Sequence, residues 1–473
     1  MALVTPVALL PATEVGPVHF IAIGGAGMSG IAQAYADLGV EVSGSDRDDS
    51  AALRKLAAAG VRTHVGHDAA QLGDARTVVV SSAIKPGNAE LDEARRRGLR
   101  VWHRSAALGA LMLGRRGIAI TGTHGKTTTT GMVATMLIGA GADPGYVIGS
   151  PLAASGESAA LGGGPAFAVE ADESDGSFLQ YPAEIVVITN IEADHLDNWG
   201  TPERYVEGFV EIGSARAVRV VVSSADEPAS REVASRLRAA GKRVVTYGEA
   251  ADADLRLDGL ELTPRTTAAT LHDGEEGGRL ELVVPGRFNL HNAAAAYAVG
   301  RELGVDGATL RAALGAFAGT QRRFEFKGEA AGVRVYDDYA HHPTEVAAVL
   351  RAARPRVAEG GRLVACFQPH LFSRTRDFMD AFAEALTLAD VIVLCAVYPA
   401  REDAVDFPGV TSEVLAERVC ARGSEVTLVE GVTDAATALA RLVRPGDLAL
   451  TIGAGNVTAA GPALLAILGG ERE

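Results

Sequence analysis

The sequence predicts an α/β protein of three domains built on parallel sheets. Three observations support this prediction. The chain has 473 residues, which is more than one hydrophobic core usually holds. Apolar strand-like runs alternate with helical patterns in three successive blocks, as in βαβ units. Two glycine-rich loops each follow an apolar run and precede a helical pattern, which is typical of phosphate-binding sites in such folds.

Each block has its own series of expected elements. In the first, strands are expected at 18–23, 40–46, 77–84 and 99–104. The second opens at 117–120 and continues with runs at 165–175 and 184–197, a hairpin-rich acidic stretch at 249–286 and a helix at 289–303. In the third, the runs are 333–345, 362–370, 389–399 and 447–456. The predicted domains are therefore 1–114, 115–324 and 325–473.

Composition narrows the class of protein. The net charge of -15 argues against a general nucleic-acid binder, which would present a basic face. No uninterrupted apolar run approaches ~18 residues, so no membrane span is expected. The amino-terminal stretch has no Lys or Arg before its apolar run, so it is a poor signal peptide. Cys366, Cys395 and Cys420 have no metal-binding spacing. A cytoplasmic enzyme is expected, as a monomer or weak homodimer.

The first glycine cluster is GAGMSG at 25–30. It fits the pattern G-x-G-x-x-G, and Asp46 lies 21 residues beyond Gly25, at the end of the next expected strand. The pattern suggests NAD binding. Its physical basis is less specific, because glycines let the backbone approach and a helix N-terminus holds any diphosphate. The motif alone therefore leaves open a nicotinamide cofactor and another nucleotide diphosphate, such as a UDP-sugar.

The second loop, in GIAITGTHGKTTTT, departs from the strict phosphate-loop pattern because Ile120 stands where the first glycine is expected. Backbone N–H groups from Gly122 to Thr128 can still cradle phosphates. Lys126 can supply a positive charge to the β- and γ-phosphates, and the Thr127 hydroxyl can ligate Mg²⁺. Two such loops in one chain indicate two different phosphate compounds, which disfavours NAD.

Candidate metal ligands follow two apolar runs of the second block. Glu170 ends the run AFAV, and EIVVITN leads into Glu192, Asp194 and His195. The carboxyl ends of parallel strands meet at one edge of the sheet, where open α/β sheets bind ligands. These side chains are therefore expected near the phosphate loop.

Six motifs, taken in order along the chain, together resemble those of a known protein family. They are TGTHGKT, VEADESD, TNIEADHLD, QRRFE, DDYAHHPTE and QPHLFSRT. Together they closely resemble the Mur ligases, in particular the alanine-adding type, over about residues 18–460. The resemblance implies a Rossmann-like N-terminal domain for UDP-N-acetylmuramate, a central P-loop ATPase domain and a Rossmann-like C-terminal domain. That third domain would bring the amino acid and close over the site.

The resemblance also implies residue roles. ATP would contact Gly122, Thr123, His124, Gly125, Lys126, Thr127, Thr128, Asn289 and Asn292. The UDP-sugar would contact Gly25, Ala26, Gly27, Met28, Ser29, Asp46 and Ser82. Mg²⁺ would be held by Thr127, Glu170 and His195. Lys126, His195, Arg323, Asp338, His342 and Arg374 would serve catalysis, with Asp338 or His342 as the base for the amine, and Tyr339 and Arg374 would bind the amino acid.

The implied reaction is the ATP-dependent joining of L-alanine to the muramate carboxylate through an acyl phosphate, in peptidoglycan precursor synthesis. Two departures from the family pattern stand out. Phe288 replaces the histidine of G-x-H-N, and Arg401 stands where some relatives have glycine. No Lys lies between residues 127 and 241, so the carbamoylated lysine of relatives that add later residues is absent.

Three alternatives remain open from the sequence. A recycling ligase that attaches an intact tripeptide to the same UDP-sugar would share nearly all of these motifs. An NAD-dependent dehydrogenase would use the first glycine cluster but leave Lys126 without a role. A P-loop switch protein would use the second loop and leave the first cluster unexplained.

Overall fold

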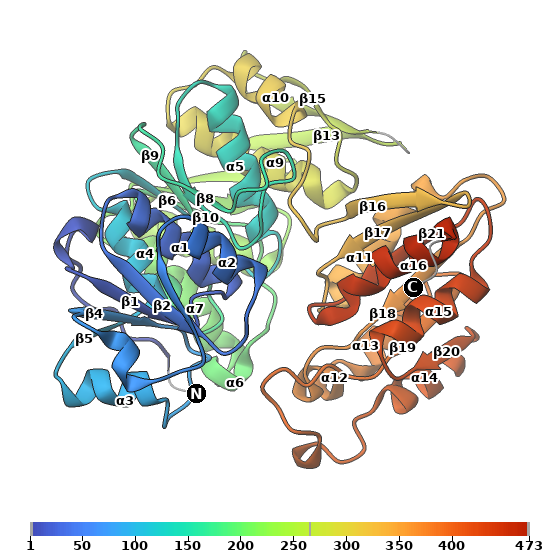
Figure 1. The fold of residues 1–473 in the computed structure, drawn as a ribbon. Helices are drawn as coiled ribbons and strands as arrows, with labels where there is room; N and C mark the ends of the chain where they lie inside the picture. Colours follow the sequence, from blue (N-terminus) through green and yellow to red (C-terminus); the bar gives the residue numbers. More distant parts are fainter. Residues whose placement is uncertain (1–2, 264–265, 471–473) are drawn as a thin grey trace. The chain divides into compact units, whose positions relative to one another are not determined.

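The computed structural model describes residues 3–263 and 266–470, and it contains three sheets flanked by helices (Figure 1). The predicted α/β class is confirmed. The first two sheets lie mainly in one compact unit and the third sheet lies in another.

The first sheet has five parallel strands in the order β3-β2-β1-β4-β5. The strands are β1 (Val18–Ile21), β2 (Val42–Asp46), β3 (Arg62–Val65), β4 (Thr77–Val80) and β5 (Arg100–His103). Its helices are α1 (Ala26–Asp37), α2 (Ala51–Ala58), α3 (Ala89–Arg96) and α4 (Arg104–Met112). Strand order reverses between β1 and β4, so the crevice that binds ligands in such sheets is expected beside the end of β1.

The second sheet has ten strands in the order β15-β14-β13-β12-β11-β10-β6-β9-β7-β8. They are β6 (Arg116–Thr121), β7 (Gly145–Val147), β8 (Ala159–Ala160), β9 (Ala166–Glu170), β10 (Ile185–Ile188), β11 (Val220–Ser224), β12 (Arg243–Gly248), β13 (Leu255–Leu262), β14 (Thr267–His272) and β15 (Gly278–Leu282). β6 pairs in parallel with β9 and β10, which brings the ends of these three strands together. β13, β14 and β15 are neighbours joined by short connections, as the hairpins expected at 249–286 require.

Helices flank the second sheet (Figure 1). They are α5 (Lys126–Gly139), α6 (Leu196–Trp199), α7 (Pro202–Ser214), α8 (Pro228–Ala239), α9 (Arg287–Glu302) and α10 (Gly307–Gly315). The start of α7 is specified locally, because the Thr201 side chain accepts from Arg204 N and Pro202 occupies the first turn. The aromatic rings of Phe178, Trp199, Tyr205 and Phe209 pack edge to face in the core beneath α7.

The third sheet has six strands in the order β16-β17-β21-β18-β19-β20, with an antiparallel β16–β17 pair and otherwise parallel neighbours. They are β16 (Glu325–Ala330), β17 (Val333–Asp338), β18 (Leu363–Phe367), β19 (Val391–Cys395), β20 (Val426–Val429) and β21 (Leu448–Ile452). The helices are α11 (Pro343–Ala353), α12 (Phe372–Asp377), α13 (Met379–Leu386), α14 (Ser412–Cys420), α15 (Val432–Leu442) and α16 (Ala460–Gly469). Cys366 and Cys395 are buried in this sheet, whereas Cys420 is exposed.

Within residues 3–263 and 266–470, none of the helices combines the length and apolar character that crossing a bilayer demands.

Candidate active site

The second glycine-rich loop joins β6 to α5 and has the backbone of a phosphate cradle. Gly122 (φ +127°) and Gly125 (φ +84°) adopt conformations that L side chains rarely adopt. A Cβ at Gly125 would lie 2.7 Å from Oδ1 of Asn292, so α9 closely abuts the loop. The first turn of α5 starts at Lys126, and its free backbone N–H groups favour an anion at this end.

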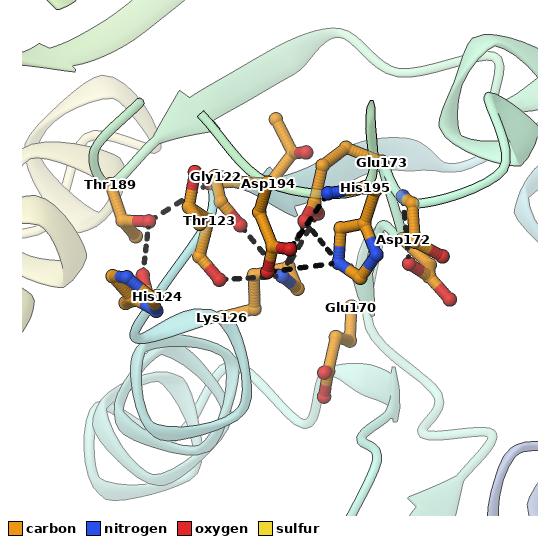
Figure 2. A network of polar contacts seen from close by, with 12 residues as sticks. Gly122, Thr123, His124, Lys126, Glu170, Asp172, Glu173, Thr189, Asp194 and His195 are labelled. Carbon is orange, nitrogen blue, oxygen red and sulfur yellow. Dashed lines mark hydrogen bonds and ion pairs between the residues drawn. The ribbon is translucent and has the colours of Figure 1, made fainter. Parts of the chain in front are cut away.

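The residues after β10 hold this loop in place. Thr189 Oγ1 and Asn190 Nδ2 donate to the His124 carbonyl at 2.6 and 2.9 Å, and His124 N donates to Asn190 Oδ1 at 2.8 Å. Thr123 Oγ1 donates to the Glu192 carbonyl at 2.9 Å, and the His124 ring lies 2.9 Å from a Glu192 carboxylate oxygen. Figure 2 shows the contact between Thr189 and His124. The cradle is therefore preorganised by side chains more than sixty residues away in the sequence.

Lys126 points into a group of carboxylates (Figure 2). Its Nζ donates to the Gly122 carbonyl at 2.7 Å and to the Thr123 carbonyl at 3.1 Å, and it pairs with Glu173 at 2.9 Å. Burial alone would lower the pKa of Lys126, but the charges of Glu173, Asp172 and Glu170 outweigh burial and raise this pKa. The ammonium is therefore charged, and it is held where a phosphate oxygen would replace a carboxylate.

Glu173 is a residue that the sequence interpretation missed. Its side chain is fully buried, and burial together with the charge of Asp172 raises its pKa to about 7, although Lys126 lowers it. The only signal in the sequence was its place in VEADESD, three residues after Glu170. A buried carboxylate with a raised pKa beside a lysine is a candidate for a functional group.

Two predicted metal ligands lie side by side. Thr127 Oγ1 donates to Glu170 Oε1 at 2.9 Å, and the other Glu170 oxygen accepts from Gly149 N at 2.8 Å. Hydroxyl and carboxylate oxygens at the end of a phosphate cradle are the ligands that Mg²⁺ prefers. These two residues therefore fit a Mg²⁺ ion, which they would hold through oxygen ligands.

His195, the third predicted ligand, occupies the left-handed backbone region (φ 54°) before α6. Its Nε2 lies 3.4 Å from Asp194 Oδ2 and 4.0 Å from Glu173 Oε1. The structure thus brings His195 beside the buried carboxylates around Lys126 (Figure 2). A non-glycine residue in this backbone conformation is held there by its surroundings, a pattern that is enriched at functional sites.

The first glycine cluster leads from β1 into α1. Gly24 N donates to Asp46 Oδ2 at 2.8 Å, so Asp46 fixes the turn before the helix. Gly25 stands at the cap position of α1 without a side-chain cap, and Met28 is buried. Gly30 serves packing, because a Cβ there would lie 3.2 Å from the Ala159 side chain in β8. The turn and the helix N-terminus can therefore bind a diphosphate mainly through backbone N–H groups.

Arg104, at the start of α4, lies between the first glycine cluster and Asp172, which follows β9 of the second sheet. A Cβ at Gly27 would collide with its guanidinium, and the same guanidinium donates to Asp172 Oδ2 at 2.7 Å. Burial would raise the pKa of Asp172, but Arg104 and Lys126 lower this pKa well below its usual range. Arg104 thus lies between Gly27 and Asp172, and Asp172 is also influenced by the charge of Lys126. The sequence interpretation did not include Arg104.

Ser82 lies at the same junction between the first two sheets. Its Oγ donates to Asp175 Oδ2 at 2.5 Å and lies 3.2 Å from His103 Nε2. Burial lowers the pKa of His103, although Asp175 opposes that shift. Ser82 therefore shares its junction with His103, a further polar residue that the sequence interpretation did not include.

The two predicted asparagines lie in the first half of α9, and both are buried. Asn289 Nδ2 donates to the Pro285 carbonyl at 2.6 Å, and Asn292 faces Gly125. Phe288 packs against Gly286, so this position contributes packing in place of the polar group of the family pattern.

The end of β17 carries the predicted Asp338 and Tyr339. Asp338 accepts from Phe324 N at 2.8 Å and from Ala340 N at 2.7 Å, and burial raises its pKa to about 6 against the charge of Arg323. The guanidinium groups of Arg322 and Arg323 lie over the Tyr339 ring, 4.8 and 5.3 Å from its centroid. Asp338 therefore fastens the segment that contains Arg323.

His342 and Arg374 belong to the same unit. His342 is buried at the start of α11 and packs edge to face on Phe378, 4.6 Å between ring centroids. Arg374, in α12, lies near two histidines that the sequence interpretation omitted, His341 and His370. Burial, with Arg374 as a further cause, lowers the pKa of His341 to about 3 and that of His370 to about 4. Both imidazoles are therefore neutral at neutral pH, and the positive charge near them comes from Arg374 and, beside His370, also from Arg401.

Comparison with protein families defines the class of this protein. Residues 17–116 match the model for the Mur ligase family catalytic domain, residues 120–300 the Mur ligase middle domain, and residues 322–455 the Mur ligase glutamate ligase domain. The chain belongs to the Mur ligase family.

Individual relatives narrow the comparison. The chain is 61% identical over 472 residues to a UDP-N-acetylmuramate–L-alanine ligase of Cutibacterium acnes (strain DSM 16379 / KPA171202), covering 100% of both chains. It is 50% identical over 479 residues to the enzyme of that name from Thermobifida fusca (strain YX), covering 99% of this chain and 100% of the relative. A solved UDP-N-acetylmuramate-alanine ligase from Thermotoga maritima superposes with a TM-score of 0.81 at 29% identity, covering 96% of this chain and 100% of that chain.

A solved murein peptide ligase from Psychrobacter arcticus also superposes, with a TM-score of 0.71 at 26% identity, covering 96% of this chain and 99% of that chain. These relatives favour a ligase over the dehydrogenase and the switch protein considered from the sequence. They also favour the alanine-adding type over the recycling type, because the relatives of higher identity carry the first name.

Proposed function

We propose that this protein joins L-alanine to the carboxylate of UDP-N-acetylmuramate, with hydrolysis of ATP to ADP and phosphate, in peptidoglycan precursor synthesis. The observation that carries the proposal is that Arg104 lies beside Gly27 of the first glycine cluster and pairs with Asp172, whose pKa is also lowered by the charge of Lys126. This arrangement suits a reaction in which a carboxylate on a UDP-sugar must meet the γ-phosphate of ATP. The full-length identity to L-alanine ligases supports the same conclusion.

In the first step the muramate carboxylate attacks the γ-phosphorus of ATP, the bond from this phosphorus to the bridging oxygen breaks, and an acyl phosphate forms as ADP leaves. Gly122 to Thr128 would hold the phosphates, and Lys126 would exchange Glu173 for a phosphoryl oxygen as negative charge develops. Thr127, Glu170 and His195 would hold Mg²⁺. When bound, Mg²⁺ neutralises charge on the phosphoryl oxygens. Asn289 and Asn292 would face the nucleotide.

In the second step the amine of L-alanine attacks the acyl phosphate, and phosphate leaves from the tetrahedral intermediate. Arg374 would grip the amino-acid carboxylate and Tyr339 would border its side chain. The amine must lose a proton, and Asp338 and His342 are the candidates. Asp338, with its raised pKa, has the better-matched proton affinity, but both its oxygens already accept backbone N–H groups. Arg323 would stabilise the phosphoryl group.

A substrate assay tests the proposal directly. The protein is incubated with ATP, Mg²⁺ and UDP-N-acetylmuramate, and phosphate release is measured with each single amino acid in turn. L-Alanine should give the highest kcat/KM, and glycine, which lacks one methyl group, should be about 10–200-fold poorer. Preference for L-Ala-D-Glu-meso-diaminopimelate over L-alanine would instead assign the protein to the recycling ligases.

The UDP-sugar site is tested with Gly27→Val. The new side chain should displace the Arg104 guanidinium and obstruct the approach of a diphosphate to the backbone. We expect the KM for UDP-N-acetylmuramate to rise by about tenfold or more, the equivalent of about 1.4 kcal/mol, while ATP binding changes little. Steady-state kinetics and calorimetry measure both quantities.

Gly469→Val is a matched control, because this glycine lies at the end of α16 with open space around its Cβ position. Calorimetry that shows micromolar binding of NAD, or no binding of the UDP-sugar to the wild-type protein, would refute the assignment of the first domain.

The amino-acid site is tested with Arg374→Lys. Lysine keeps the positive charge but loses the planar fork that binds a carboxylate with two parallel hydrogen bonds. We expect the KM for L-alanine to rise by at least about tenfold, with the KM for ATP nearly unchanged. Arg418→Lys is the control in the same unit, since Arg418 is exposed on α14 and pairs with Asp380. Equal effects of the two substitutions would contradict the role of Arg374.

A further inference from the structure

The segment at 398–407 is hydrogen-bonded through its first residue to residues 369–371, which lead into α12. Tyr398 N donates to the Pro369 carbonyl at 2.8 Å, and Leu371 N donates to the Tyr398 carbonyl at 2.9 Å. The rings of His370 and Tyr398 stack, with 5.7 Å between centroids and 13° between planes. The two segments thus form a short ladder just before the helix that carries Arg374.

The ladder continues through Glu402 onto the helix itself. The Glu402 carboxylate accepts from Ser373 N at 2.9 Å and from Ser373 Oγ at 2.5 Å, so both of its oxygens bind one residue. α12 has only six residues, and its cap residue, Leu371, gives no side-chain hydrogen bond. Glu402 supplies from a distant segment the cap that the helix lacks locally.

Further contacts fix the other side of the helix start. Phe407 stacks on Phe372, with 5.9 Å between centroids and 17° between planes, and the Arg376 guanidinium lies 5.6 Å from the Phe407 centroid. Leu371 has φ +69°, a conformation that a branched side chain keeps only when its surroundings enforce it. The direction of α12 is therefore imposed by the segment at 398–407.

We propose that Glu402 is a positioning residue for the amino-acid site: by binding Ser373 with both carboxylate oxygens, it sets the placement of the adjacent Arg374. The proposal rests on the proposed function, in which Arg374 grips the carboxylate of the amino acid. Glu402 acts through Ser373 and the helix backbone. Its removal should therefore weaken amino-acid binding and leave the nucleotide and UDP-sugar sites as they are.

Glu402→Gln tests this inference, because glutamine keeps the volume but loses the charge and turns an N–H₂ toward Ser373. We expect the KM for L-alanine to rise about tenfold, with kcat at saturating L-alanine and the KM values for ATP and UDP-N-acetylmuramate within about twofold of wild type. Ser373→Ala should move the same parameter in the same direction. The double variant should be no worse than Glu402→Gln, since Ser373→Ala removes one of the two hydrogen bonds that Glu402→Gln already disturbs.

Glu417→Gln is the matched control, because Glu417 is an exposed carboxylate on α14 in the same unit and its loss changes the net charge equally. Hydrogen exchange at residues 372–377 gives a readout that does not depend on catalysis, and Glu402→Gln should lower protection there alone. An unchanged KM for L-alanine overturns the inference. So does a parallel rise in all three KM values with a lowered Tm, which would indicate general destabilisation.

The assay also separates this inference from the proposed function. If the wild-type protein prefers the tripeptide to L-alanine, the proposed function fails, and the variants are then measured with the tripeptide as acceptor. A rise in the tripeptide KM in Glu402→Gln, with lowered protection at 372–377, would still support Glu402 as a positioning residue. An unchanged tripeptide KM would overturn that role as well.

Discussion

Lys126→Ala should fold normally and lose ATP-dependent phosphate release by about 10²–10³-fold in kcat, which corresponds to about 3–4 kcal/mol. The reason is that the Lys126 ammonium lies at the start of α5, inside the phosphate cradle, where negative charge concentrates during phosphoryl transfer. The variant also leaves Glu173 buried without its cation, so this carboxyl should bind a proton at neutral pH. Protonation removes the cost of a buried unpaired charge and explains why folding should survive.

Lys242→Ala is the matched control for this experiment. Lys242 Nζ also donates to two carbonyls, those of Ala215 and Val218, at 2.7 and 3.0 Å, but it lies away from the cradle. Its replacement should leave kcat within about twofold of wild type. If Lys126→Ala kept more than about a tenth of the wild-type turnover, a loss of less than about 1.4 kcal/mol, Lys126 could not be the phosphoryl ligand that we propose.

Glu170→Gln should produce the second large effect, through Mg²⁺. The amide can still accept the hydrogen bonds from Gly149 N or Thr127, so the loop should keep its shape, but the negative oxygen ligand is lost. We expect the Mg²⁺ concentration at half-maximal rate to rise by about 10–100-fold and kcat at saturating Mg²⁺ to fall by about 10²-fold. A titration of phosphate release against Mg²⁺ measures both.

Glu184→Gln serves as the control on the same sheet. Glu184 precedes β10 and pairs with Arg116 at 2.8 Å, at the end of the strands opposite to the cradle. Its replacement should not change the Mg²⁺ dependence. A Glu170→Gln enzyme with the wild-type Mg²⁺ response would assign the metal to other residues and leave Glu170 as a support for the loop around Gly149.

Much of the framework was predictable because it depends on local patterns. The runs ahead of Gly25 and Gly122 are buried parallel strands, and the glycines with special backbone angles lie where the motifs placed them. Within 165–175 the strand is Ala166–Glu170, so Glu170 ends it as the apolar run AFAV indicated. Residues beyond Glu170 leave the sheet because their acidic side chains turn to bind Lys126 and Arg104, a tertiary effect that apolar periodicity does not contain.

The sequence by itself determined the α/β class, the two phosphate-binding loops and the resemblance to Mur ligases, because glycine spacing and apolar alternation are local properties of the chain. Only the tertiary structure decided that Arg104 lies between Gly27 and Asp172, and that Glu402 caps the helix of Arg374. Arg104 and Asp172 lie 68 residues apart in the chain, and Ser373 and Glu402 lie 29 residues apart. The roles of these residues depend on burial and on neighbouring charges, which come together only in the folded protein. Glu173 is an example, because a carboxylate in water has neither the raised pKa nor the fixed partner that Glu173 acquires on folding.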